Sequence, residues 1–90
     1  MSSLMPRVEP RAMSIACSDD ELRVSLTDGR TLTVPIAWFP RLAHASSSER
    51  ADYEILGDGE GVHWPKVDED ISVVGLLAGQ PSIEAKSAFV

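Results

Sequence analysis

Imidazole, indole and carboxylate side chains gather in one short stretch of the chain, between residues 61 and 72. His63 and Trp64 are followed within six positions by three consecutive acids, Asp68, Glu69 and Asp70. An imidazole with several carboxylates is a donor set that suits zinc or manganese. His63 and Asp68 could also act as a catalytic dyad, provided that a nucleophile or a bound water completed the site.

Each of these chemistries has a simpler alternative, which we prefer. Only one histidine takes part, and acids directly before an apolar helical pattern complement the positive end of a helix dipole. No serine or cysteine lies in a recognisable nucleophile elbow. We therefore expect no metal site, no cofactor and no enzymatic activity. The alternative is a ligand- or metal-sensing site around His63, Trp64, Asp68 and Asp70.

The negative charge of the chain is concentrated in residues 51–70. This segment holds seven acids against Lys66 alone, a net charge of −6 that equals the formal net charge of all 90 residues. The acids are Asp52, Glu54, Asp58, Glu60, Asp68, Glu69 and Asp70. An acidic balance repels phosphate backbones, so direct binding of nucleic acid is not expected. The pattern predicts an acidic face that suits a basic partner.

The composition is typical of a globular cytoplasmic protein. Hydrophobic residues make up 43% of the chain and charged residues 24%, which excludes a disordered polyelectrolyte. The single cysteine, Cys17, excludes an internal disulfide and fits a reducing compartment. No apolar run reaches the roughly 18–20 residues that a membrane span needs, and the N-terminus lacks the apolar core of a secretory signal.

The segment 11–81 is predicted to be a single domain, between a loose lead-in (1–10) and a weakly patterned tail (82–90). Alternation of apolar and polar residues predicts a first strand over 13–17 and a hairpin of strands 22–26 and 32–36. A three-residue hairpin loop ending at Gly29 puts both apolar rows on one face, with Gly29 in a left-handed conformation. We prefer this register to a two-residue loop.

Short helices and strands are predicted to follow the hairpin. Residues 38–45 suit a helix with Pro40 in its first turn, and Ser46 with Glu49 has capping-box spacing for a second helix that runs to about Tyr53. Brief strands are expected at 54–56 and 62–64, then a helix from Ile71 with the three acids in front of it. The fold class is α+β, a small and mainly antiparallel sheet with an N-terminal three-strand meander and short helices packed against it.

Trp38 and Trp64 are expected to anchor the core, and the alternative is that one of them lines a partly open groove and faces a partner. Arg41 is expected to neutralise part of the acidic segment, for example through Asp68 or Asp70. Cys17, on an alternating strand, is interpreted as a small core residue.

Several blocks carry a resemblance that covers residues 13–79. They are Leu26-Thr27-Asp28-Gly29-Arg30, Val34-Pro35-Ile36, Trp38-Phe39-Pro40-Arg41-Leu42, Arg50, Gly61-Val62-His63-Trp64-Pro65, Asp68-Glu69-Asp70-Ile71-Ser72 and Gly75-Leu76-Leu77. With these blocks the chain resembles the small prokaryotic domain-of-unknown-function family 2442. The resemblance implies a compact α+β domain with no established activity and no assigned active site. It also implies an arrangement beside another short gene, similar to that of toxin–antitoxin pairs.

We therefore expect a non-enzymatic protein-interaction module, antitoxin-like or regulatory, that binds a small basic protein through its acidic half. The candidate contact residues are Trp38, Arg41, Asp58, Glu60, His63, Trp64, Asp68 and Asp70. A domain this small, with a sheet edge exposed, also has reason to form a homo-oligomer.

Overall fold

The computed structural model describes residues 9–82, which form two three-stranded antiparallel sheets and short helices. The first sheet has the order β1-β2-β3 and the second the order β4-β5-β6. The strands are β1 (Ala12–Cys17), β2 (Glu21–Leu26), β3 (Thr31–Pro35), β4 (Glu54–Leu56), β5 (Gly61–Trp64) and β6 (Glu69–Ser72). The α+β class and the N-terminal meander are confirmed. The expected single sheet is in fact two, and most of the predicted lead-in and tail lies outside the described residues.

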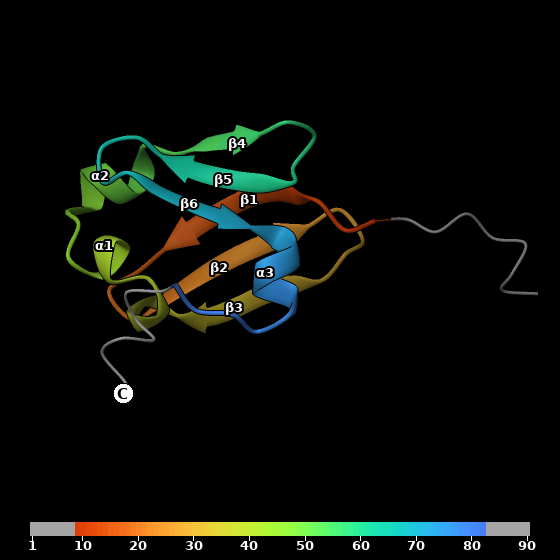
Figure 1. Ribbon diagram of the computed structural model, residues 1–90, viewed down its shortest axis with the longest axis horizontal. Coiled ribbons are helices and arrows are strands. Elements are labelled where there is room, and N and C mark those ends of the chain that lie inside the picture. Colours follow the sequence, from red (N-terminus) through yellow and green to blue (C-terminus); the bar gives the residue numbers. More distant parts are fainter. Residues whose placement is uncertain (1–8, 83–90) are drawn as a thin grey trace, which may run out of the picture.

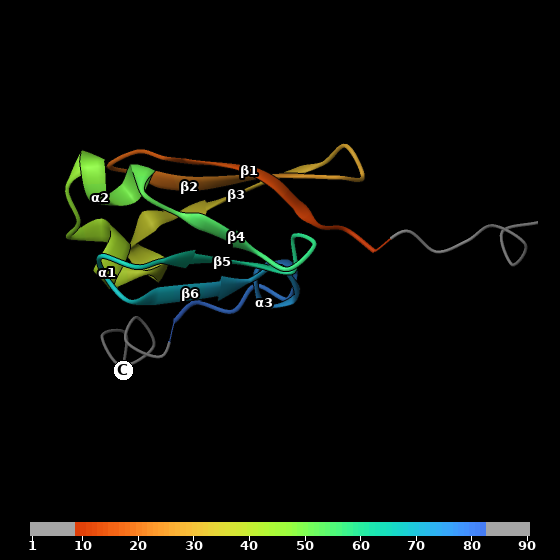
Figure 2. The ribbon, with the colours of Figure 1, turned by 90° about the horizontal axis from the view of Figure 1, so that it is seen from above.

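The helices connect and cap the two sheets. They are the 3-10 helix η2 (Ile36–Trp38) and the α-helices α1 (Pro40–Ala43), α2 (Ser47–Ala51) and α3 (Val73–Leu77). The two sheets form two layers, with α1 and α2 at one end and α3 at the other (Figures 1 and 2). None of the helices within 9–82 has the length and apolar character needed to cross a membrane.

The β2–β3 hairpin has the register that places both apolar rows on one face. Leu22 lies opposite Val34, and Val24 opposite Leu32. Gly29 closes the three-residue loop with φ of +94°, a conformation that favours glycine because it has no Cβ. The predicted register is confirmed, and it directs Leu22 and Val24 into the core.

Local sequence signals also fix the two helices of the connection. Pro40 is the first residue of α1. Its missing N–H costs no hydrogen bond there, because an N–H at this position has no acceptor within the helix. Ser46 caps α2 with a complete capping box: its Oγ accepts the Glu49 N–H at 3.2 Å, and Glu49 Oε1 accepts the Ser46 N–H at 2.8 Å. Both predictions are confirmed, although each helix is shorter than expected.

The helix expected after the three acids is present, but its predicted start at Ile71 is wrong, because residues 69–72 form the edge strand β6. Trp64 lies opposite Glu69, and Val62 opposite Ile71. The helix α3 begins only at Val73, and its cap is Ser72, whose Oγ accepts the Gly75 N–H at 2.9 Å. The three acids therefore do not complement a helix dipole. Four residues are too few for their sequence pattern to distinguish a strand from a helix. Pairing with β5 decides between the two.

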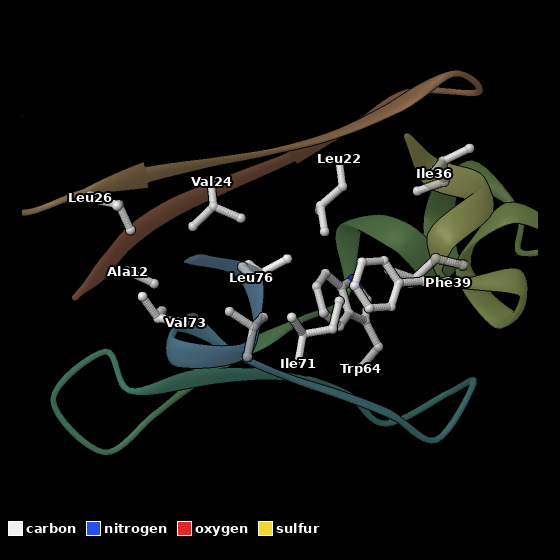
Figure 3. Close-up of a cluster of buried hydrophobic side chains, with 12 residues drawn as sticks. Ala12, Leu22, Val24, Leu26, Ile36, Phe39, Trp64, Ile71, Val73 and Leu76 are labelled. Carbon is white, nitrogen blue, oxygen red and sulfur yellow. The ribbon is translucent and has the colours of Figure 1, made fainter. Parts of the chain in front are cut away.

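The core lies between the two sheets and is closed by α3. Its fully buried side chains come from both layers, with Leu22 and Val24 from β2 facing Trp64 and Ile71 from the second sheet (Figure 3). Leu76 of α3 enters the same space. Burial of apolar surface between the layers is thus what joins two sheets that share no strand.

Candidate functional site

Trp64 is a core residue and not an exposed anchor. Its side chain has 0% exposed area, its Nε1–H donates to the Arg50 carbonyl at 3.0 Å, and its ring lies 6.3 Å from that of Tyr53. The interpretation in which Trp64 lines an open groove is therefore wrong for this fold, because β5 directs the indole between the sheets (Figure 3). Trp38 is half-buried and packs against the core cluster.

Arg50 is a structural residue whose role the sequence did not reveal. Only 8% of its side chain is exposed, and its Nη1 lies 2.7 Å from Asp19 Oδ1. Its Nε donates to the Leu42 carbonyl at 2.8 Å and its Nη2 to the Ala43 carbonyl at 2.9 Å. One guanidinium thus ties α2 to the end of α1 and to the β1–β2 turn. The sole signal for it was its place among the residues of the family resemblance.

Arg41 binds the turn that carries Asp68. Its Nη1 donates to the Asp68 carbonyl at 2.7 Å and lies 3.6 Å from Asp68 Oδ2. Asp68 has φ of +53°, which is uncommon for a residue with a side chain. The expected neutralisation of the acidic segment through Asp68 is confirmed, and the main contact holds the backbone of the β5–β6 turn.

The outer face of the second sheet carries a row of three polar residues, one on each strand. His63 on β5 lies opposite Glu54 on one side and Asp70 on the other. His63 Nδ1 is 2.5 Å from Asp70 Oδ1. Trp64 is on the opposite face of the strand, and Asp68 is held by Arg41. The alternative sensing site therefore brings together only His63 and Asp70, and residues 9–82 contain no group of three or more ligands that could hold a metal ion.

The remaining acids of 51–70 lie mostly at the surface. Asp68, Glu60 and Asp70 have side chains 87%, 72% and 70% exposed. Asp58, in the turn between β4 and β5, is also exposed, whereas Glu69 is only 7% exposed. Glu69 is thus removed from the acidic face because β6 turns its side chain inward.

One cation from outside the segment and one within it offset part of this charge. Arg11 Nη1 lies 3.0 Å from Glu60 Oε1, although the two residues are 49 positions apart. Asp52 has Lys66 at 3.9 Å. Exposed pairs of this kind contribute little to stability. Within the part of the chain that the structure describes, no ion pair reaches Glu54 or Asp58.

The thiol of Cys17 is a poor nucleophile. It is half-buried on β1 and packs against the core. Burial raises its pKa, and the charge of Arg50 opposes this only in part. The thiol therefore stays protonated at neutral pH, in keeping with a role in packing.

A family model described as "Protein of unknown function (DUF2442)" matches residues 12–82. The chain belongs to this family. None of the curated proteins matches it.

Two solved structures resemble this DUF2442 chain over most of its length. The crystal structure of a protein of unknown function from Rhodospirillum rubrum is 36% identical, with a TM-score of 0.71, and the match covers 87% of this chain and 96% of that one. The solution NMR structure of an uncharacterized protein from Chromobacterium violaceum is 22% identical, with a TM-score of 0.71, over 88% and 75% of the two chains. The second likeness shows the fold alone.

Three of the residues that carry the family resemblance make structural contacts here. Trp64, Arg50 and Arg41 bond to backbone carbonyls of neighbouring elements, and Trp64 and Arg50 are buried. In this chain, therefore, these three residues hold the fold.

Proposed function

We propose that this protein is a non-enzymatic interaction module, antitoxin-like or regulatory, that binds a small basic protein through an acidic surface. The acidic surface is formed by the exposed acids of the second sheet and its loops: Asp52, Glu54, Asp58, Glu60, Asp68 and Asp70. The observation that carries the proposal is the exposure of these six acids, while the aromatic and arginine residues beside them in sequence hold the fold.

The strongest electrostatic attraction is expected near Glu54 and Asp58. These two lack an ion-pair partner among residues 9–82, whereas Glu60, Asp68 and Asp70 each have a cationic or titratable neighbour. Complementary charge accelerates encounter more than it increases affinity. The partner's basic residues are therefore expected to set the association rate and its dependence on salt.

The test measures how reversal of charges on the acidic surface changes the rate at which this protein associates with its purified partner. Purification of the tagged chain from its host at low salt provides the basic partner, and the association rate is then measured for the double variant E54K/D58K. We expect the variant to associate more slowly than the wild type. The difference between the two association rates should shrink as salt rises, because the screening length falls from about 10 Å at 0.1 M to about 3 Å at 1 M.

A matched control is the charge reversal D20K, in the β1–β2 turn of the other sheet, where Asp20 is also exposed. The acidic surface is not the binding face if E54K/D58K associates at the wild-type rate. The same conclusion follows if D20K slows association, per charge reversed, as much as E54K/D58K does. An antitoxin-like role further predicts that the partner, expressed alone, inhibits growth and that co-expression of this chain relieves the inhibition.

A further inference from the structure

Helix α3, the β4–β5 turn and the start of β1 meet at one end of the molecule (Figures 1 and 2). An apolar hollow lies among residues of these three segments. Its volume is about 330 Å³. It is lined by Pro10, Arg11, Glu60, Val73, Val74 and Leu77. We refer to it as the α3 hollow. This volume is at the lower end of the range of roughly 300–1,000 Å³ found for ligand pockets.

The helix beside the hollow is apolar on its exposed side as well as on its buried side. Val73 and Leu76 face the core, with 2% and 4% of their area exposed. Val74 is 77% exposed and Leu77 38% exposed, and α3 has no polar side chain. A helix that is apolar all round is normally buried. The exposed side of α3 therefore has the character of a contact surface.

The rim of the hollow carries two acids that pair with one arginine. Glu9 and Glu60, with side chains 75% and 72% exposed, both contact Arg11, at 3.5 Å and 3.0 Å. The Arg11 backbone is fixed in turn, since its N–H donates to Thr27 Oγ1 at 3.1 Å. Asp58 lies two residues before Glu60 in the same turn. Two acids against one arginine leave this rim with a net charge of −1, and the exposed Asp58 adds negative charge in the same turn as Glu60.

We propose that the α3 hollow is the anchor point of the acidic surface and takes an apolar side chain from a basic amphipathic segment of the partner. Lysine or arginine residues flanking that side chain would contact Glu9, Asp58 and Glu60. A buried apolar anchor supplies affinity that exposed charges do not, and the charged rim selects the partner. A second copy of this chain is a poorer occupant, because two such rims would bring like charges together.

This inference rests on the proposed function and extends it by naming the contact. The probe is a set of three model peptides of equal length, one of leucine and lysine in amphipathic order, one with serine in place of leucine, and one with glutamate in place of lysine. Each is titrated into the isotope-labelled full chain while amide chemical shifts are recorded. The leucine–lysine peptide is expected to shift the signals of residues 60–61 and 73–77, and the other two are expected to bind much more weakly.

The variant V74K replaces a largely exposed side chain, so it is expected to fold as the wild type does. It should weaken binding of the leucine–lysine peptide by at least about tenfold, as loss of an interface anchor does. The control T33K adds the same charge at an exposed position on β3 and should leave the affinity within about twofold.

The outcomes separate this inference from the proposed function. A different result is that the peptide shifts only signals around Glu54 and Asp70, while V74K binds it as the wild type does. That result would overturn the role of the α3 hollow as an anchor point and would leave the acidic surface as the binding face. Equal binding of the serine–lysine peptide would show that charge alone acts, and would also overturn the anchor. Failure of both lysine peptides to shift any signal would count against the inference and the proposed function together.

Discussion

Gly59 offers the sharpest test of how the two sheets are joined. It lies in the turn between β4 and β5 with φ of +101°. Its carbonyl accepts the Ala12 N–H at 2.7 Å, at the start of β1. A Cβ at this position would stand 2.6 Å from the Ala12 carbonyl oxygen and 2.9 Å from the Ala12 nitrogen. The third neighbour is Arg11 Cβ at 2.9 Å, which is bonded directly to the backbone, so the overlap cannot be relieved by moving the far end of a flexible side chain.

The cost of Gly59→Ala can be divided into two parts. A left-handed conformation costs a residue with a Cβ about 1–2 kcal/mol. Moving the turn away from β1 to relieve the overlap would break the hydrogen bond to Ala12, which costs about another 1–3 kcal/mol where a backbone group is left unpaired. Gly29→Ala is the matched control, because Gly29 also has positive φ, +94°, but a Cβ there would meet nothing within 4 Å among the described residues.

We therefore expect Gly59→Ala to lower the free energy of unfolding by about 2–5 kcal/mol, and Gly29→Ala by about 1–2 kcal/mol, so that the difference between the two variants is the cost of the lost contact. Urea unfolding followed by circular dichroism and tryptophan fluorescence gives both values. In a domain of this size each kcal/mol corresponds to roughly 4–8 °C in Tm. Equal losses for the two variants would refute the reasoning, because they would show that the approach of turn and strand contributes nothing.

Two further predictions follow from the buried and capping residues. Trp64→Ala is expected to cost about 3–5 kcal/mol in urea unfolding, as truncation of a large core side chain does; a variant that kept full stability and lost only partner binding would contradict the core assignment. The Ser46 N–H lowers the pKa of Glu49 below its ordinary value of 4.5, so this carboxylate stabilises the fold above that pH and the stabilisation is lost as the pH falls through the lowered pKa. The stability gap between wild type and Glu49→Gln should accordingly be present at neutral pH and shrink under acid, and a gap that did not change with pH would show that the capping carboxylate carries no charge-dependent role.

The features that the sequence predicts well are those decided by neighbouring residues. The β2–β3 register follows from two alternating rows and the position of Gly29. The start of α2 follows from Ser46 and Glu49, whose side chains bond each other's backbone within one turn. Such signals need no knowledge of the rest of the fold, and the structure agrees with them.

The features that the sequence missed depend on residues far apart in the chain. Residues 69–72 are a strand because β5 is there to pair with, and this pairing turns Glu69 into the interior. Arg50 is buried because the carbonyls of Leu42 and Ala43 and the carboxylate of Asp19 surround it. For the candidate site, the exposure of the acids was predictable from their charge, whereas the apolar hollow at α3 was not, because three separate segments form it.

The order of the strands bears on how this domain folds. In both sheets every pairing joins strands that follow each other in the chain. Each sheet can therefore form from contacts of short sequence separation, and chains with such topology tend to fold quickly. The contacts between the layers come later in this scheme, and they include the fit of the Gly59 turn against β1 and the enclosure of Trp64. We thus expect the docking of two preformed halves, and not the formation of either, to be the step that limits the folding rate.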